Sequence, residues 1–310
     1  MDVKERESQV LLAGAGNMGM EYARVLDALN VSYTAVTRGE EKAITFEQKT
    51  GHRAVTGGIE KFILNHERNY NAAIVALPVP LQKECVLLLI KSGIRKILLE
   101  KPGSFYIHDL QEMNQIAKEN NADIKIAYNR RFYNSVLEAE KLINEDGGIS
   151  SIFFEFTELY CKKKEDLQEY FMGNSTHVMD LAFYFGGMPK DISGFTKIDD
   201  KDLIFTGAGI TEKGILFSYM ANYCAPGRWG VEVMTPKHRL IFRPMEKLHI
   251  QELNSFRIYE WEIADQDDIL FKPGLYKEVK TFLYDMSNPR LLSSEEQEMH
   301  MGCYNQIMNF

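Results

Sequence analysis

The chain has 310 residues, a formal net charge of −8 at pH 7 and four cysteines. A chain of this length exceeds the usual size of a single hydrophobic core, so we expect two domains. The acidic balance disfavours nonspecific binding to nucleic acid and to anionic membranes. There is no apolar run of about eighteen residues, and the polar N-terminus is unlike a signal peptide, so we expect a cytoplasmic protein without a membrane segment.

The cysteines carry no recognisable site. They have neither the spacing of metal ligands nor that of a disulfide framework, which favours a reducing compartment and predicts no metal centre. Their positions are Cys85, Cys161, Cys224 and Cys303.

A glycine-rich loop follows the first predicted strand, at residues 9–13, and precedes a helix predicted over 18–29. This order of strand, turn and helix is the one that the dinucleotide-binding fingerprint requires. The first glycine permits a tight turn, the second lets the backbone approach a pyrophosphate, and the third lets the helix pack closely. The helix N-terminus then faces the phosphates. An ordinary strand-to-helix turn is the alternative. The expected cofactor-binding residues of this loop are Gly14, Gly16, Asn17, Met18 and Gly19.

The end of the next predicted strand, 31–36, helps to choose the cofactor. NAD-dependent enzymes usually place an acidic residue there, whereas this chain has Thr37 and Arg38. A carboxylate would repel the 2′-phosphate of NADP(H), while a hydroxyl and a guanidinium can bind it. We therefore expect NADP(H) as the preferred cofactor. NAD(H) is the alternative, with Arg38 stacked on adenine, and Glu40 and Glu41 weaken the distinction.

Strands and helices continue to alternate up to residue 128. This alternation predicts a doubly wound parallel sheet with right-handed crossovers, whose ligands bind at the carboxyl ends of the strands. Strands are predicted over 71–77, 94–100 and 122–128, with helices over 81–92 and 109–120. The residues at or just beyond these strand ends, expected on the same rim as the glycine loop, are Leu77, Pro78, Glu100, Lys101 and Asn129.

Beyond Tyr128 the pattern changes to successive strands with short links, which favour a large, open, mostly antiparallel sheet. A helix over 132–144 and another, opened by the segment 272–276 and running to about 285, accompany it. We expect an α/β protein with a dinucleotide-binding Rossmann domain at 1–128. A substrate-binding and oligomerisation domain follows at 129–310, and its extreme C-terminus is a candidate for packing on the first domain. The strands are predicted over 149–160, 203–209, 214–223, 230–235, 238–243, 246–251 and 257–263.

The order of these motifs resembles that of the Gfo/Idh/MocA family, the glucose–fructose oxidoreductase and inositol dehydrogenase family. The resemblance spans nearly the whole chain, and Glu100-Lys101-Pro102 is its most specific mark. It also rests on the glycine loop, on 76–78, on 128–132 and on the segment around His177. Segments 225–230 and 272–276 resemble the branch associated with bacterial surface-sugar biosynthesis. The resemblance implies hydride transfer between a nicotinamide and a carbohydrate, and an open sheet that joins a homodimer or homotetramer.

Within this resemblance Lys101 and His177 are the candidate catalytic residues. Lys101 would donate a hydrogen bond to a carbonyl being reduced or assist proton removal from an alcohol, and Glu100 would orient the strand end or the cofactor. Relatives commonly carry an aspartate four residues before the histidine, but this chain has Gly173 there. Either His177 transfers the proton, since imidazole titrates near neutrality, or Lys101 works alone and His177 only binds a hydroxyl.

Further residues are candidates for binding the substrate, a sugar, sugar phosphate or sugar nucleotide. The last predicted strand of the first domain is followed by Asn129, Arg130 and Arg131, and the planar fork of one of these arginines suits a carboxylate, phosphate or diphosphate. Interdomain salt bridging is the alternative. Asn174 and Asp180 accompany His177, with Asp180 on the same side of the predicted helix. Trp229 suits stacking on a sugar or base, or packing at an interface between subunits.

Two other functions remain open from the sequence. An enzyme that retains NAD tightly could use transient oxidation for epimerisation or glycoside cleavage. A non-catalytic cofactor-binding regulator is the other option, which Gly173 favours and Lys101 opposes. Gln82 stands where relatives often carry a histidine, so no role is carried over to it.

Overall fold

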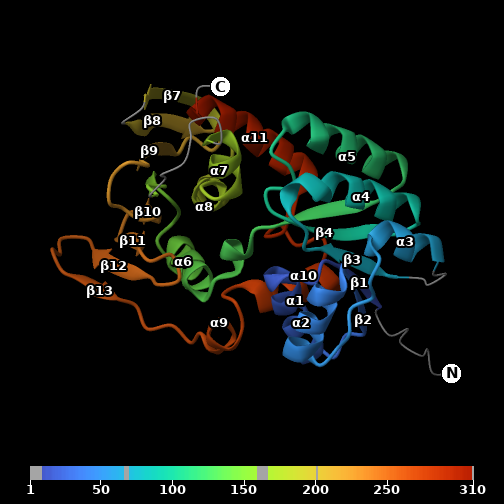
Figure 1. The fold of residues 1–310 in the computed structure, drawn as a ribbon. Helices are drawn as coiled ribbons and strands as arrows, with labels where there is room; N and C mark the ends of the chain where they lie inside the picture. Colours follow the sequence, from blue (N-terminus) through green and yellow to red (C-terminus); the bar gives the residue numbers. More distant parts are fainter. Residues whose placement is uncertain (1–8, 66–69, 159–166, 200–201, 309–310) are drawn as a thin grey trace. The chain divides into compact units, whose positions relative to one another are not determined.

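The structure is a computed structural model that describes residues 9–65, 70–158, 167–199 and 202–308. The chain divides into two compact units. The first unit comprises Met1–Tyr128 and Leu270–Glu298, and the second comprises Asn129–Ile269 and Met299–Phe310. Figure 1 shows the elements of each unit along the chain.

A six-stranded sheet forms the centre of the first unit. Strands β1 to β5 are parallel to their neighbours, and the short β14 pairs antiparallel with β5. Every residue of β1 and of β3 is buried, as a parallel sheet covered on both faces requires. The spatial order is β14 (Leu292–Ser293), β5 (Asp123–Ala127), β4 (Lys96–Glu100), β3 (Ala72–Val75), β1 (Val10–Ala13) and β2 (Tyr33–Val36).

Helices cover both faces of this sheet (Figure 1). Helices α4 (Gln82–Lys91) and α5 (Ile107–Glu119) pack against each other and on strands β3 to β5. Helix α1 (Asn17–Ala28) packs on β1 and β2 and against α10 (Leu275–Tyr284), so the late segment 270–298 contributes to the first unit.

The crossover between β2 and β3 contains two helices that the sequence patterns did not predict, α2 (Glu40–Thr50) and α3 (Gly58–Asn65). Only Ala43 and Phe46 of α2 are buried, and only Phe62 of α3. The narrow apolar stripe of α2 gives little helical periodicity in the sequence, and α3, with eight residues, is short for a helix to be identified from its pattern. The turn η1 (Val79–Leu81) links β3 to α4.

An eight-stranded sheet forms the second unit, and every neighbouring pair in it is antiparallel except β6 with β9. Strand β7 was not predicted, because most of its side chains are exposed and show no alternation. The last two residues of the predicted strand 149–160, and Cys161, lie outside the described residues. The spatial order is β13 (Ile258–Glu260), β12 (His249–Glu252), β11 (His238–Phe242), β10 (Gly230–Met234), β6 (Ser151–Glu155), β9 (Leu216–Asn222), β8 (Leu203–Thr211) and β7 (Pro189–Ile198).

One face of the second sheet carries the core of this unit. The Phe154 ring of β6 stacks with the Tyr219 ring of β9, with ring centroids 5.6 Å apart. Helix α8 (Thr176–Gly186) packs on β6 and β10. Tyr219 requires a glycine opposite it, since a Cβ on Gly207 would lie 2.4 Å from the Tyr219 hydroxyl. The other helices of the chain are η2 (Asn129–Phe132), α6 (Asn134–Glu145), α7 (Leu167–Gly173), α9 (Gln266–Leu270) and α11 (Ser294–Met308).

No helix within the described ranges is both long and apolar enough to cross a membrane.

Candidate functional site

The glycine loop ties three strand ends of the first unit together. Gly14 adopts a φ of +118°, a conformation that side-chain-bearing residues rarely reach, and its N–H donates to the Val36 carbonyl at 2.9 Å. A Cβ on Gly14 would lie 2.3 Å from the carbonyl oxygen of Ala76, just after β3. Glycine is therefore needed here for both the backbone angle and the close approach of β3.

The other two glycines have different roles. A Cβ on Gly19 would lie 2.1 Å from the Gly14 carbonyl, so helix α1 can begin this close to the loop only with glycine at that position. A Cβ on Gly16 would meet no atom within 4 Å. Gly16 caps α1 without any side-chain hydrogen bond to the cap, so the open side of the loop exposes first-turn amides that an anion can use.

A cavity of about 580 Å³, the rim cavity, opens beside this loop. It gathers all the predicted cofactor-binding residues except Gly19, which is taken up by packing on Gly14. Gln82 also lines it, with its amide donating to the Leu77 carbonyl at 3.0 Å. The predicted residues in its lining are Gly14, Gly16, Asn17, Met18, Thr37, Arg38, Leu77, Pro78, Glu100 and Lys101.

A second cavity of about 430 Å³, the side cavity, shares Thr37 and Arg38 with the rim cavity. Its far wall includes Gly57 and Gly58, which sequence reasoning missed because no motif marks them. Both adopt positive φ, and Gly58 donates its N–H to the Thr37 carbonyl at 2.9 Å. The adjacent glycine pair was the one signal in the sequence that pointed to a turn here.

Glu100 lies at the end of β4, within the lining of the rim cavity. Tyr22 of α1 donates its hydroxyl to the Glu100 carboxylate at 2.7 Å. Burial raises the pKa of Glu100, and the Tyr22 hydrogen bond and the positive charges of Lys272 and Lys101 offset only part of that rise. Lys272 reaches this place from the late segment, with its Nζ 2.8 Å from the Met18 sulfur.

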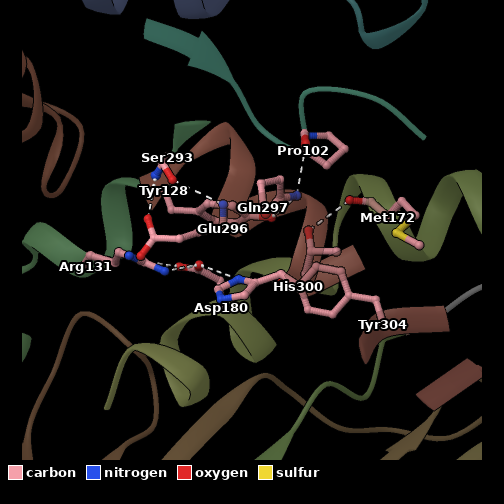
Figure 2. A network of polar contacts seen from close by, with 11 residues as sticks. Pro102, Tyr128, Arg131, Met172, Asp180, Ser293, Glu296, Gln297, His300 and Tyr304 are labelled. Carbon is pink, nitrogen blue, oxygen red and sulfur yellow. Dashed lines mark hydrogen bonds and ion pairs between the residues drawn. The ribbon is translucent and has the colours of Figure 1, made fainter. Parts of the chain in front are cut away.

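The turn that follows Lys101 is held by a buried amide. Gln297, which is completely buried, donates from Nε2 to the Pro102 carbonyl at 3.0 Å and to the Tyr128 hydroxyl at 3.2 Å (Figure 2). The sequence offered no signal for this contact, because Gln297 is far from Pro102 along the chain. The backbone immediately after Lys101 is therefore fixed by helix α11.

In the second unit Asp180 is a buried ion-pair partner (Figure 2). Arg131 donates to its two oxygens from Nε at 2.9 Å and Nη2 at 2.6 Å, and Nδ1 of His300 lies 3.5 Å from Oδ1. Burial would raise the pKa of Asp180, but Arg131 and His300 hold it below its usual value. Asp180 was predicted to bind substrate; its carboxylate is fully buried and engaged by these two neighbours.

His177 and its neighbours lie at the start of α8. The His177 side chain is nearly buried, and its ring centroid is 6.0 Å from that of Trp229. Ser175, the residue before α8, donates its hydroxyl to Glu158 at 2.7 Å and makes no cap hydrogen bond to the helix. Asn174 donates to the Tyr170 carbonyl at 3.3 Å, and Asn129 is buried in η2.

A third cavity of about 340 Å³, the Arg130 pocket, lies within the second unit. The Arg130 guanidinium carbon is 4.6 Å from the centre of the Trp229 ring, a cation–π arrangement. The pocket is lined by Arg130, Thr157, Glu158, Tyr170, Gly227, Arg228, Trp229, Pro244, Met245 and Glu246. Arg130 and Trp229 were named from the sequence, whereas Glu158 and Tyr170 were not.

Residues 8–128 match the model of the Gfo/Idh/MocA family, described as an oxidoreductase family with an NAD-binding Rossmann fold. No curated protein sequence matches this chain. Solved structures with the same fold include UDP-N-acetylglucosamine 3-dehydrogenase GnnA from Acidithiobacillus ferrooxidans, at 16% identity and a TM-score of 0.76, covering 97% of this chain and 96% of that one.

Two further solved structures share this architecture. Aldose-aldose oxidoreductase from Caulobacter crescentus, complexed with glycerol, has 17% identity and a TM-score of 0.78, covering 98% of this chain and 97% of that one. Levoglucosan dehydrogenase, in complex with NADH and L-sorbose, has 17% identity and a TM-score of 0.75, covering 97% and 96%. At these identities the likeness establishes the fold, while the family match establishes an NAD-binding oxidoreductase domain.

Proposed function

We propose that this chain, a Gfo/Idh/MocA oxidoreductase by the match of residues 8–128, transfers a hydride between a nicotinamide cofactor and a carbohydrate alcohol or ketone. The observation that carries the proposal is the lining of the rim cavity, which holds both the glycine loop and Lys101. A phosphate-binding element and a proton-transferring group in one cavity are what such a reaction needs. The sugar-processing neighbours support the carbohydrate class.

The residues present fit a dinucleotide. The open side of Gly16 and the uncapped first turn of α1 suit the pyrophosphate, since amide donors and the helix dipole favour an anion there. When bound, the nicotinamide supplies or accepts the hydride. Leu77 and Pro78, at the end of the β3 segment, form part of the wall beside which that ring would lie.

Lys101 is the proton-handling group of the proposal. In the reducing direction its ammonium donates a proton to the carbonyl oxygen as the carbon gains the hydride, and in the oxidising direction its amine accepts the hydroxyl proton. Glu100, which accepts a hydrogen bond from Tyr22, is adjacent to Lys101. Because the pKa of Glu100 is raised, its carboxyl group stays protonated to a higher pH than a free carboxyl group does. His177 then contacts a substrate hydroxyl or shares the proton transfer.

We also propose a preference for NADP(H). Thr37 and Arg38 line both cavities of the first unit, and Lys42 lines the rim cavity. These side chains suit a 2′-phosphate, whereas Glu60 and Glu84 in the side cavity act against it. Titration of the cofactor-free protein with NADPH and NADH measures the preference. Tighter NADH binding would overturn it, and an NAD that cannot be exchanged would favour the transient-oxidation enzyme.

Replacement of Lys101 by alanine tests the reaction itself. The variant is expected to lose turnover by at least about a hundredfold, the usual contribution of general acid–base catalysis, and to keep cofactor binding. Sugars, sugar phosphates and sugar nucleotides are screened by NADPH absorbance. Lys96, exposed at the opposite end of β4, is the matched control, and Lys96→Ala should behave as the wild type. Unchanged turnover in Lys101→Ala would leave the non-catalytic regulator as the better reading.

A second copy of this chain is proposed as the partner of the second sheet. Leu216, Met220 and Phe195 are exposed on the face opposite the aromatic core. Phe195 and Met220 lie in one row across the sheet, since both pair with Thr206, and Leu216 follows on the same face of β9. Exposed apolar groups on a broad sheet are typical of an interface between subunits. Light scattering on the purified protein should give a dimer or tetramer mass, and Met220→Lys should lower it. A monomeric wild type contradicts this proposal.

A further inference from the structure

The Arg130 pocket combines an aromatic platform with a cation inside one unit. Arg130 lies against the Trp229 ring at 4.6 Å, and Arg228 lies in the exposed part of the lining. An indole face offers a stacking surface for the apolar side of a sugar ring. The pocket, at about 340 Å³, has the size of a small-molecule site.

Two donors in this pocket lack an acceptor. Arg130 Nε and Trp229 Nε1 are both shielded from solvent, and neither has a hydrogen-bond partner within the part of the chain that the structure describes. A buried donor without a partner destabilises the protein, and the cost is greater when the donor is charged. A ligand that presents acceptor oxygens to these two groups would remove that cost.

The two carboxylates that line the same pocket do not accept from these donors. Glu158 already accepts hydrogen bonds from Tyr170 at 2.8 Å and Ser175 at 2.7 Å. Glu246 is exposed at the edge of the lining. Burial lowers the pKa of Arg130 while Tyr133, Glu246 and Glu158 oppose the change, but a guanidinium stays charged at neutral pH. The unmet demand in the pocket is therefore for ligand oxygens that carry negative charge.

The pocket adjoins the candidate catalytic histidine. Trp229, which stacks with Arg130, also lies 6.0 Å from the His177 ring, measured between ring centroids. Trp229 therefore links the pocket to His177 within the second unit.

We infer that the substrate is an acidic carbohydrate whose anionic group is bound by Arg130 Nε and Trp229 Nε1. The inference rests on the proposed function for its link to hydride transfer, but the binding itself is testable alone. The shared chemistry is a set of negatively charged oxygens, which a uronic carboxylate or a sugar phosphate can supply.

Calorimetric titration with matched sugars tests the inference on the whole protein with NADPH bound. The probes are glucose, glucuronate and glucose 6-phosphate, followed by UDP-glucose and UDP-glucuronate. Glucuronate or glucose 6-phosphate should bind about tenfold or more tightly than glucose, or UDP-glucuronate about tenfold more tightly than UDP-glucose, which lacks the carboxylate, since a charge-assisted hydrogen bond contributes that much. Preference for glucuronate identifies a carboxylate, and preference for glucose 6-phosphate identifies a phosphate.

Two variants and one control separate the role of the pocket from general charge. Arg130→Met should abolish the preference, and Trp229→Phe, which keeps a ring but removes the indole donor, should reduce it severalfold. Arg257 stacks on Tyr259 in the same unit, with its guanidinium carbon 5.8 Å from the ring centre, so Arg257→Met is the matched control and should keep the preference. If Arg130→Met does not fold, Trp229→Phe still decides.

Equal binding of acidic and neutral sugars, no binding of any acidic probe, or an unchanged preference in both pocket variants would overturn the inference. These outcomes differ from failure of the proposed function. A protein that binds an acidic sugar through Arg130 without hydride transfer would keep the inference and refute the function. Turnover of neutral sugars that acidic sugars do not inhibit would do the reverse.

Discussion

Two carboxylates with shifted pKa values, the partly exposed Glu100 of the first unit and the fully buried Asp180 of the second, titrate in opposite directions. Glu100 of the first unit is bonded to a neutral hydroxyl of Tyr22, and its pKa is raised. Asp180 of the second unit is held by Arg131 and His300, and its pKa is lowered. Burial by itself would raise the pKa of both carboxyl groups. The charge of the direct partner therefore decides whether a buried acid stays ionised.

The difference matches the place of each residue in the fold. Glu100 lines the rim cavity beside Lys101, where a carboxyl group that gains a proton easily can influence the chemistry. Asp180 lines none of the three cavities, and its two oxygens are engaged by a bidentate arginine. An acidic residue with a raised pKa in a cavity suggests a functional role, whereas an acidic residue outside the cavities whose two oxygens are held in an ion pair indicates a structural role.

Breaking the ion pair should have the largest effect. Arg131→Met leaves Asp180 buried and without its strongest partner, so we expect the second unit to lose about 3–5 kcal/mol of stability. Both tryptophans, Trp229 and Trp261, belong to the second unit, so urea unfolding followed by their fluorescence reports on that unit. The double variant Arg131→Met/Asp180→Leu should recover much of the loss. A change below about 1 kcal/mol in the single variant would contradict a structural role.

The pH dependence should separate the two acids by sign. The folded pKa of Glu100 lies above 4.5, so the proton is bound more tightly in the folded state and stability falls as the pH rises through that pKa. The folded pKa of Asp180 lies below 3.8, so its contribution is present above 3.8 and is lost as the pH falls through the folded pKa.

Glu100→Gln is the variant that isolates the contribution of Glu100 to the pH dependence of stability. It should be more stable than the wild type at pH 8, with the difference vanishing below pH 4.5, and the change should be smaller than that of Arg131→Met. Hydrogen exchange in β4 and α1 measures it within the first unit, and Asp180→Asn should show a destabilisation at neutral pH in the second. A Glu100→Gln protein that is less stable at pH 8 would show that the ionised form is favoured.

Helix α11 carries one neutral and one charged side chain that hold neighbouring elements, and substitution of the neutral one should have the smallest of the effects predicted here. Its Gln297 supports the turn after Lys101 through a neutral amide, whereas its His300 joins the ion pair at Asp180. Gln297→Glu removes the donor at nearly constant shape. If Gln297 positions Lys101, kcat should fall by roughly tenfold and its pH profile should shift, while cofactor binding stays unchanged.

Gln111 provides the control for this helix. The Gln111 amide, on α5, donates to the Glu298 carboxylate of α11 at 3.2 Å in an exposed contact. Gln111→Leu should therefore leave kcat unchanged. Wild-type kcat together with a wild-type pH profile in Gln297→Glu would limit Gln297 to packing. Recovery of kcat in Gln297→Asn is not expected, because the shorter side chain cannot reach the Pro102 carbonyl.

The sequence by itself determined the features that depend on short stretches of chain. The alternation of strands and helices up to residue 128 predicted the parallel sheet, since the strands and most of the helices are specified by their own apolar periodicity, although α2 and α3 were missed. Gly14 and Gly19 were identified because a tight turn and a close helix leave no room for a Cβ, and spacing alone shows this. The expectation that Lys101 lies on the same rim as the glycine loop followed from its position at the carboxyl end of a parallel strand, and both line the rim cavity.

Only the tertiary structure decided the features that join distant segments. It brought Lys272 and Gln297 to the first unit, paired Asp180 with Arg131 and His300, and set Arg130 against Trp229. No local periodicity encodes such contacts, because each depends on how whole elements pack and on which polar groups are left to satisfy one another. The role of a buried charge is set by its partners in space, and the sequence does not list those partners.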